Sequence, residues 1–313
     1  MARDRSARSA RRRERALAFI RQLPWRSLEN PYDPVSVLTD EQIESIHTAS
    51  LSVLRDTGMD FLHPEAIAIL RSAGADVADE GPRVRFDPAM IEDLIDTIPA
   101  EFEMYARNPG RNVTIGGRHV NFLAVGSAPN SSSLDTGRRP GNFSDFSDLV
   151  KLTQHFNVVS LHAGYPVEPV DIDPSVRHLT ALAEIVRQSD KIFHAYSLGR
   201  QRILDALEIV RIARGVSMER LAAEPSLHSV INTSSPLRLD GPMIEGMIEM
   251  LRHGQVVVIT PFTLSGAMAP ATISGALVQQ NAEALAGMAF SLSLIHISEP
   301  TRLKTRSRMP SSA

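Results

Sequence analysis

The sequence predicts an α/β fold, namely a partial (β/α)8 TIM barrel of about five units with an N-terminal α+β extension. Apolar runs recur along the chain, and a loop with Pro, Ser, Asn or Gly and then a stretch of helical spacing follow each of them. This alternation is typical of parallel strands joined by crossover helices. The apolar runs are His119–Gly126, Asn157–Gly164, Lys191–Ser197, Ser226–Thr233 and Gln255–Pro261.

The repeating units occupy about residues 118–290, and helical spacing is clearest at Arg200–Arg214, which Gly215 ends. A closed barrel of this type needs eight units, whereas the pattern stops near Phe290. We therefore expect a C-terminally truncated enzyme that is inactive as a fragment. Its unpaired strand edges and exposed apolar surface should promote aggregation.

The sequence pattern of residues 37–117 predicts that they form the N-terminal α+β extension. Thr39, with Gln42 three residues later, has the pattern of a capping box that opens a helix, and Gly58 is placed to end it. Pro64 and Pro88 begin two further helices, because proline suits the first turn. Short strands are expected at Val84–Phe86, Phe102–Ala106 and Val113–Ile115.

The two ends of the chain differ from the rest in composition. Residues 1–36 are a basic arm and lead-in, with seven arginines between Arg3 and Arg15 and no apolar segment behind them, which excludes a secretory signal. A solvated arm is the favoured interpretation, and polyanion binding or a transit peptide are the alternatives. Residues 291–313 resemble translated sequencing-adaptor DNA, so we expect a non-native tail without function; a natural basic tail is the alternative.

The composition is that of a soluble globular protein, with 43% hydrophobic and 22% charged residues in 313. A net charge of −3 gives no indication of nucleic acid or an anionic membrane as partner. The absence of cysteine excludes disulfides, thiolate nucleophiles and Cys-ligated metal sites, and it fits the cytoplasm. No apolar run approaches the ~18–20 residues of a membrane span.

No phosphate loop, dinucleotide fingerprint, zinc-protease motif or nucleophile elbow is present, so candidate residues are chosen by position. Working residues of parallel barrels lie at the C-terminal ends of strands and in the following loops. Ser127, Pro129, Ser235 and Pro261 occupy such positions. The candidates that could face a substrate or corrinoid are Asn130, His162, Tyr165, His194, Tyr196, Asn232, Thr233, Thr260 and Phe262.

Each candidate has a structural alternative. Tyr165, Tyr196 and Phe262 could hold a quaternary ammonium by cation–π attraction, although packing is the commoner role of an aromatic residue. The histidines could act as bases, but a strand-end histidine is more often simply hydrogen-bonded in place. Asn130 and Asn232 could bind an amide edge or cap a helix. No neighbouring carboxylate or second histidine has the spacing of a metal ligand set.

Several stretches of the chain, in order, resemble the trimethylamine methyltransferase family, whose corrinoid-dependent members demethylate trimethylamine and quaternary amines such as glycine betaine. The resemblance covers about residues 15–290. It is carried by Arg21–Trp25, Asn30–Tyr32, Asp60–Glu65, Tyr165–Pro169, Arg177–Leu179, Ala206–Gly215 and Gln279–Glu283.

The resemblance implies a methyltransferase that moves a methyl group from a tertiary or quaternary amine to cob(I)alamin. The cobalamin is supplied by a partner corrinoid protein and is not bound directly, no metal is required, and a homo-oligomer remains open. Members that use trimethylamine carry pyrrolysine in a part beyond this stretch, so the sequence does not show whether the full gene encodes it. Members without pyrrolysine use quaternary amines, and this is the favoured substrate class. The catalytic residues stay unassigned and are expected in the C-terminal part.

Two other readings remain open. A lyase or aldolase on the same scaffold would need a Schiff-base lysine at a strand end, but Lys151 lies on a predicted helix and Lys191 at a strand start. The chain could also be a non-catalytic fragment or a binding module.

Overall fold

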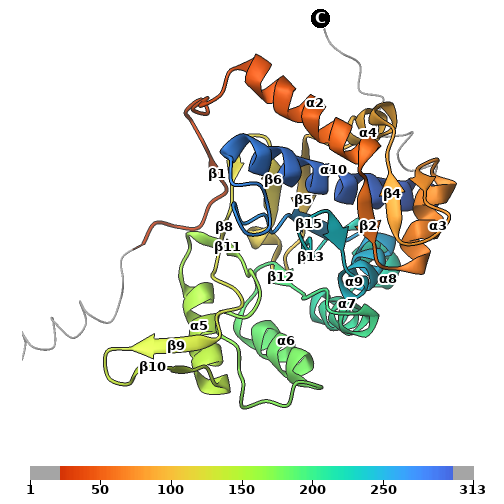
Figure 1. Cartoon of the computed structure of the whole chain (residues 1–313). Helices are drawn as coiled ribbons and strands as arrows, with labels where there is room; N and C mark the ends of the chain where they lie inside the picture. The colour runs from red at the N-terminus through yellow and green to blue at the C-terminus, as the bar shows by residue number, and fades with distance from the viewer. Residues whose placement is uncertain (1–21, 299–313) are drawn as a thin grey trace, which may run out of the picture.

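Five strands form one parallel series within residues 22–298, the part of the chain that the computed structural model describes (Figure 1). They are β8 (Phe122–Leu123), β11 (Val159–Leu161), β12 (Phe193–His194), β13 (Leu227–Asn232) and β15 (Val256–Thr260). β8 pairs with β11, β12 with β13, and β13 with β15, while a parallel bridge between Leu161 and Ile192 joins β11 to the start of β12. The chain therefore has the predicted α/β character, with neighbouring strands in chain order.

The first predicted strand, His119–Gly126, is wrong as a single element. It is divided into β7 (His119–Val120), which pairs antiparallel with β1 (Leu28–Glu29), and β8. Asn121 lies between them and donates a side-chain hydrogen bond to Thr114 O at 2.7 Å, which ties the chain to a neighbouring hairpin at this point. Each of the other four predicted runs contains one parallel strand.

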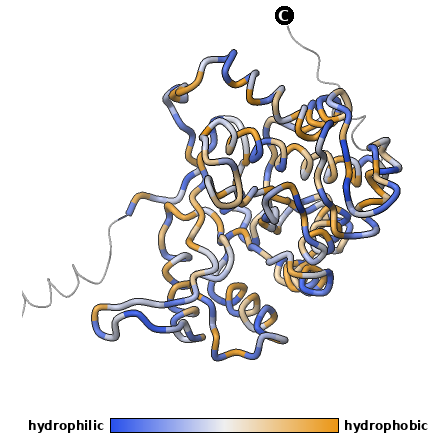
Figure 2. The backbone as a smooth tube through the Cα atoms, viewed as in Figure 1, coloured by the Kyte–Doolittle hydropathy of each residue, from blue (hydrophilic) through white to orange (hydrophobic). Residues whose placement is uncertain are grey.

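Helices follow the parallel strands and cover them. Apolar residues of the strands and of the facing helices form a continuous core, which includes Phe193 from β12 together with Ile185 and Leu207. In Figure 2, residues coloured as hydrophobic recur along these strands and helices. The helices are α5 (Phe143–His155), α6 (Arg177–Gln188), α7 (Arg200–Arg214), α8 (Met218–Ala223), α9 (Gly241–Arg252) and α10 (Ile273–Ser298).

Helix α10 is longer than the sequence predicts. The loss of helical pattern expected from residue 291 does not occur, because Leu292 and Leu294 are buried on the same helix as Phe290. None of the helices in this described region is both long and apolar enough to cross a membrane. The arginines of the basic arm and the tail after Ser298 lie outside the described residues.

The N-terminal extension forms α2 (Asp40–Asp56), α3 (Pro64–Ser72) and α4 (Pro88–Ile95) and shares a core with α9 and α10. The capping box is confirmed, since Gln42 N donates to Thr39 Oγ1 at 3.3 Å and Thr39 N donates to Gln42 Oε1 at 3.0 Å. A second sheet, in the order β14-β2-β4-β3, links the extension to the loop after β13. Its strands are β2 (Met59–Phe61), β3 (Asp76–Val77), β4 (Arg83–Arg85) and β14 (Arg238–Leu239).

Two hairpins flank the parallel strands. β5 (Glu101–Met104) and β6 (Val113–Gly116) are joined by the 3-10 turn η1 (Pro109–Arg111). They pack on Leu161 of β11 and on Ile192 and Val256 at the starts of β12 and β15. β9 (Asn130–Ser133) and β10 (Gly137–Pro140) form a polar hairpin that projects beside α5 (Figure 1). The sequence did not predict this second hairpin, because its strands lack the alternation of apolar and polar residues.

The two outer strands of the parallel group expose apolar side chains. Phe122 and Leu123 of β8 are each 48% exposed, and Val258 of β15 is 44% exposed. Within residues 22–298, β8 and β15 each pair with one parallel neighbour only, so one edge of each is open. Both edges have the composition of strands that become buried by further packing.

Candidate functional site

The C-terminal ends of β8, β11 and β12 bring Ser127, Tyr165 and Tyr196 together. Ser127 N donates to Tyr165 O at 2.8 Å, and Tyr165 N donates to Tyr196 Oη at 2.9 Å. The Tyr196 hydroxyl lies 2.8 Å from Ser127 Oγ. Ser127 has φ +62, an uncommon conformation for a residue with a side chain. This cross-connection fixes three strand-end loops relative to one another.

Gly164 allows this approach. It has φ +120, and an added Cβ would lie 2.2 Å from Tyr196 Oη and 3.3 Å from His194 Nδ1. Burial is the main cause that raises the pKa of Tyr196, so its hydroxyl remains protonated and acts as a hydrogen-bonding group. The position of the Tyr196 ring therefore depends on the missing side chain at Gly164.

Replacement of Gly164 by alanine is expected to lower the free energy of unfolding by roughly 3 kcal/mol, from backbone strain and displacement of Tyr196. Gly74→Ala is the matched control, because Gly74 has φ +98 but no atom within 4 Å of its added Cβ. Gly74→Ala should lower the free energy of unfolding only by the backbone strain, about 1–2 kcal/mol. Urea unfolding curves measure both variants; equal losses would show that contact with Tyr196 is unimportant.

The three aromatic candidates differ in their surroundings. Tyr165 is 6% exposed, and its ring lies 5.7 Å from that of Phe146 and 4.7 Å from that of Tyr196. Burial raises the pKa of Tyr165 well above 10.0. Tyr196 is half-buried and Phe262 is 50% exposed, and no ring contact joins Phe262 to either tyrosine in the described chain. Of these three aromatic residues, Tyr196 and Phe262 have surface that a ligand can contact.

Three histidines are buried close to one another: His162 directly after β11, His194 on β12 and His228 on β13. His162 Nε2 lies 2.8 Å from Ser189 Oγ, and His228 Nε2 donates to His162 O at 2.8 Å. Burial lowers the pKa of His162 to about 3 and that of His228 to about 4, and it holds the pKa of His194 well below 6.5. All three are therefore uncharged at neutral pH. Sequence reasoning missed His228, although its place in the fourth apolar run was a signal.

A second group of candidates lies where β13 and β15 end. Asn232 and Thr260 are opposite one another in the ladder and both are exposed. Thr233 is buried, and Phe262 N donates to its Oγ1 at 3.2 Å. These contacts join the ends of the two strands, so that Asn232, Thr260 and Phe262 lie on one accessible rim.

Glu283 of α10 holds this rim in place. Its carboxylate is fully buried and accepts hydrogen bonds from Thr233 Oγ1, from Ser235 Oγ at 2.6 Å and from Leu237 N at 2.8 Å. Gln279 Nε2 donates to the same carboxylate at 2.9 Å. Sequence reasoning missed Glu283, because helical spacing alone does not show that an acidic side chain points inward.

Asn130 is separate from both groups. It lies in β9 opposite Pro140, and within residues 22–298 no side-chain hydrogen bond joins it to another candidate.

Lys191 lies at the opposite end of the strands, where Nζ donates to Phe156 O at 2.8 Å, and burial lowers its pKa to about 8. Lys151 is on α5 beside Asp148. Neither lysine reaches the strand ends, which argues against Schiff-base chemistry there.

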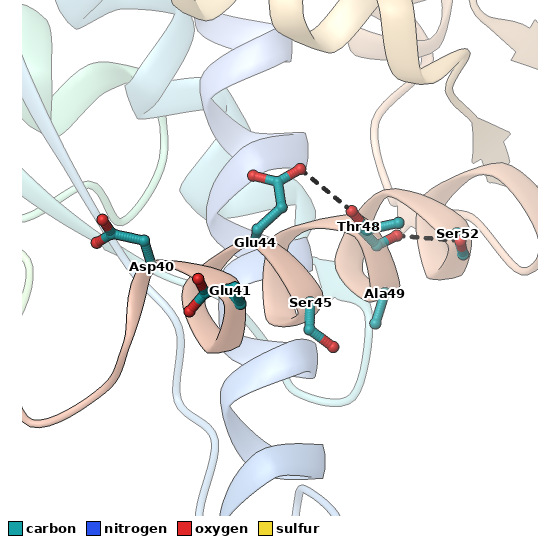
Figure 3. Close-up of a pocket in the computed structure, with 7 residues that line it drawn as sticks. All are labelled: Asp40, Glu41, Glu44, Ser45, Thr48, Ala49 and Ser52. Carbon is teal, nitrogen blue, oxygen red and sulfur yellow. Dashed lines mark hydrogen bonds between the residues drawn. The ribbon is translucent and has the colours of Figure 1, made fainter.

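A broad hollow of about 710 Å³ lies away from the strand ends, along the exposed side of α2 (Figure 3). Its lining comes from that one helix and includes Asp40, Glu41 and Glu44. Because no second element contributes a convergent group, the hollow is a helix surface and not a site.

Over the described residues, no group of three His, Asp or Glu is arranged to hold a metal ion.

Comparison with known proteins identifies relatives of the chain. The sequence profile of the trimethylamine methyltransferase (MTTB) family matches residues 4–297. A glycine betaine methyltransferase from Desulfitobacterium hafniense (strain Y51) is 34% identical over 259 residues, which cover 83% of this chain and 53% of that protein. The trimethylamine methyltransferase MttB from Desulfitobacterium hafniense (strain DSM 10664 / DCB-2) is 27% identical, covering 81% of this chain and 51% of that protein. The chain spans about half the length of these relatives.

Proposed function

We propose that this chain, which belongs to the trimethylamine methyltransferase family, is part of an enzyme that transfers a methyl group from a methylated amine to a corrinoid held by a partner protein. The family membership confirms the resemblance that the sequence indicated. The 34% identical relative is named for glycine betaine, whereas the relative named for trimethylamine is 27% identical. We therefore propose a quaternary amine as the methyl donor.

The proposed scaffold is a (β/α)8 barrel of which the described strands are a part. The parallel strands follow one another in chain order with helices between them, as barrel units do. The exposed apolar side chains of β8 and β15 support further strands on both edges. Since the relatives are about twice as long, we assign the remaining units to the rest of a full-length protein.

The rim formed by Asn232, Thr260 and Phe262, with Tyr196 from the neighbouring group, is the proposed substrate side. An aromatic face attracts a quaternary ammonium, and each desolvated contact contributes about 1–2 kcal/mol. The C–N bond breaks as the methyl group is transferred, and the electron pair stays on nitrogen. A neutral tertiary amine then leaves without a proton, so this site can work by orienting the substrate and excluding water.

Low-valent cobalt in the partner's corrinoid supplies the nucleophile for this transfer. For a corrinoid to approach, this chain would need to offer an open, apolar surface. Val125 and Phe262 are 67% and 50% exposed and meet that requirement. Tyr165, His162 and Thr233 are buried and are proposed to support the rim without touching the substrate.

The observation that carries the proposal is the family match over residues 4–297, combined with the strand ends that gather the accessible candidates. The test combines this chain with the part of the Desulfitobacterium hafniense (strain Y51) relative that the match leaves uncovered. Glycine betaine or trimethylamine is supplied with the reduced corrinoid protein, and amine products are followed by NMR.

We expect the tertiary amine product of glycine betaine when both parts are present. Phe262→Ala should lower the rate about tenfold by loss of one cation–π contact. Leu264→Ala is the matched control. Leu264 lies two residues after Phe262 and is equally exposed, 51% against 50%, but it lacks an aromatic face. Absence of product from every methylated amine would refute the proposed function.

A further inference from the structure

A small cavity lies between β12 and the helices α6 and α7, beside Tyr165 and Tyr196. His178, His194 and Arg202 also line it, and its volume is about 10 Å³. That is about the space that one water-sized atom needs. The cavity can therefore receive a single ligand oxygen, whereas a trimethylammonium group is too large for it.

His194 presents an unused hydrogen-bond donor. Val230 N donates to His194 Nε2 at 3.4 Å, so Nε2 carries the lone pair. Because the ring is uncharged, its hydrogen is on Nδ1, and this atom is buried and has no partner among the described residues. A buried donor without a partner costs roughly 1–3 kcal/mol, and native structures seldom leave one unexplained.

Arg202 presents an unused positive charge. It is half-buried in the first turn of α7, and no hydrogen bond or ion pair engages its guanidinium within residues 22–298. The neighbouring carboxylates have other partners: Glu168 binds Arg177 at 2.7 Å, and Asp205 binds His178 Nε2 at 2.8 Å.

The remaining groups at the cavity limit where an anion can sit. The first N–H of α7, that of Arg200, donates to Glu245 Oε2 at 3.3 Å, so this N–H already has an acceptor. His178 Nε2 is already engaged, because it donates to Asp205 at 2.8 Å. A ligand oxygen is therefore expected on the side of His194 and Arg202.

We infer that the Arg202 guanidinium and the Nδ1–H of His194 form a carboxylate subsite, so that the enzyme selects methylated ammonium compounds that also carry a carboxylate. This inference rests on the proposed function and assigns the specificity to Arg202. One carboxylate oxygen enters the cavity, while the ammonium end stays outside it on the aromatic side of Tyr196. Trimethylamine has no group for this subsite.

Titration calorimetry on the full 313-residue chain tests the subsite. The probes are glycine betaine, tetramethylammonium, acetate and inorganic phosphate at constant ionic strength. Arg202→Met removes the charge, and Arg202→Lys keeps it without the planar fork. Arg71→Met is the control, because it removes the same charge from an exposed position on α3. Circular dichroism verifies that each variant is folded.

We expect Arg202→Met to weaken binding of glycine betaine and acetate at least about tenfold, with a smaller loss for Arg202→Lys and none for Arg71→Met. Tetramethylammonium binding should be the same in all four proteins. Equal binding of glycine betaine by the parent chain and Arg202→Met, a response to phosphate alone, or no carboxylate binding would overturn the subsite. Arg202-dependent acetate binding without tetramethylammonium binding would support the subsite and count against the proposed function.

Discussion

Lowering the pH from about 7 to about 4.5 is expected to remove at least about 5 kcal/mol from the free energy of unfolding, because three buried histidines must stay uncharged in the folded chain. His162, His194 and His228 are at most 2% exposed. Burial is the largest cause of the lowered pKa of each, and the charge of Lys191 adds to it at His162. This loss is a large part of the ~5–15 kcal/mol that a typical domain has.

The sign follows from the two pKa values of each ring. In the unfolded chain a histidine takes up its proton near pH 6.5, whereas folded His162 and His228 do so only near about 3 and about 4. Between these values the unfolded state binds more protons, so stability falls as the pH falls. His162 and His228 each contribute about 2.5 kcal/mol by pH about 4.5, and His194 adds a loss in the same direction. The carboxylates with lowered pKa values add to the loss only below their ordinary range, near pH 4.

Urea unfolding at closely spaced pH values measures this effect. Between pH about 6 and about 5, the slope of the free energy of unfolding against pH should correspond to nearly three protons taken up on unfolding. His228→Gln keeps an N–H for His162 O but cannot titrate, so its slope should fall to about two protons. His155→Gln is the control for the substitution itself, because it makes the same change at an exposed position. A stability that is flat over this range would contradict the buried, uncharged state of the cluster.

The α/β character and most helix starts were predictable, because they depend on local patterns. Thr39 with Gln42 is a cap that works through neighbouring backbone atoms, and the structure contains it. Prolines at 64 and 88 lie in first turns as expected. The division of the first strand depends on Asn121 reaching Thr114, a tertiary contact without local signal. The length of α10 depends likewise on burial of Leu292 and Leu294.

The candidate site was predictable in position but not in the roles of its residues. The rule that strand ends carry the working residues selected Tyr196 and Phe262, which keep accessible surface. The same rule selected His162 and Tyr165, which face the packed interior. The side to which a strand-end residue points depends on the exact strand limits, and these are shorter than the apolar runs. Glu283 could not be found this way, because it comes from a helix far along the chain.

Glu283→Ala is expected to lower the free energy of unfolding by about 4 kcal/mol, because it leaves several buried donors without their acceptor. Thr233 Oγ1, Ser235 Oγ, Leu237 N and Gln279 Nε2 all donate to this carboxylate. The two hydroxyls can turn toward one another, since they lie 3.2 Å apart. The N–H of Leu237 has no such freedom, and only water entering the new space can replace the carboxylate.

Glu249→Ala is the matched control, because Glu249 is also a buried helix carboxylate, 3% exposed. Its partners Arg200 and Arg252 reach the surface, where water can solvate them, so the loss should be about 1 kcal/mol. Urea unfolding gives the two free energies. Hydrogen exchange adds a local test: in Glu283→Ala the amides of Leu237 and Phe262 should exchange faster than in Glu249→Ala, because Thr233 then no longer holds the ends of β13 and β15 together. Equal losses in the two variants would mean that Glu283 does not organise this rim.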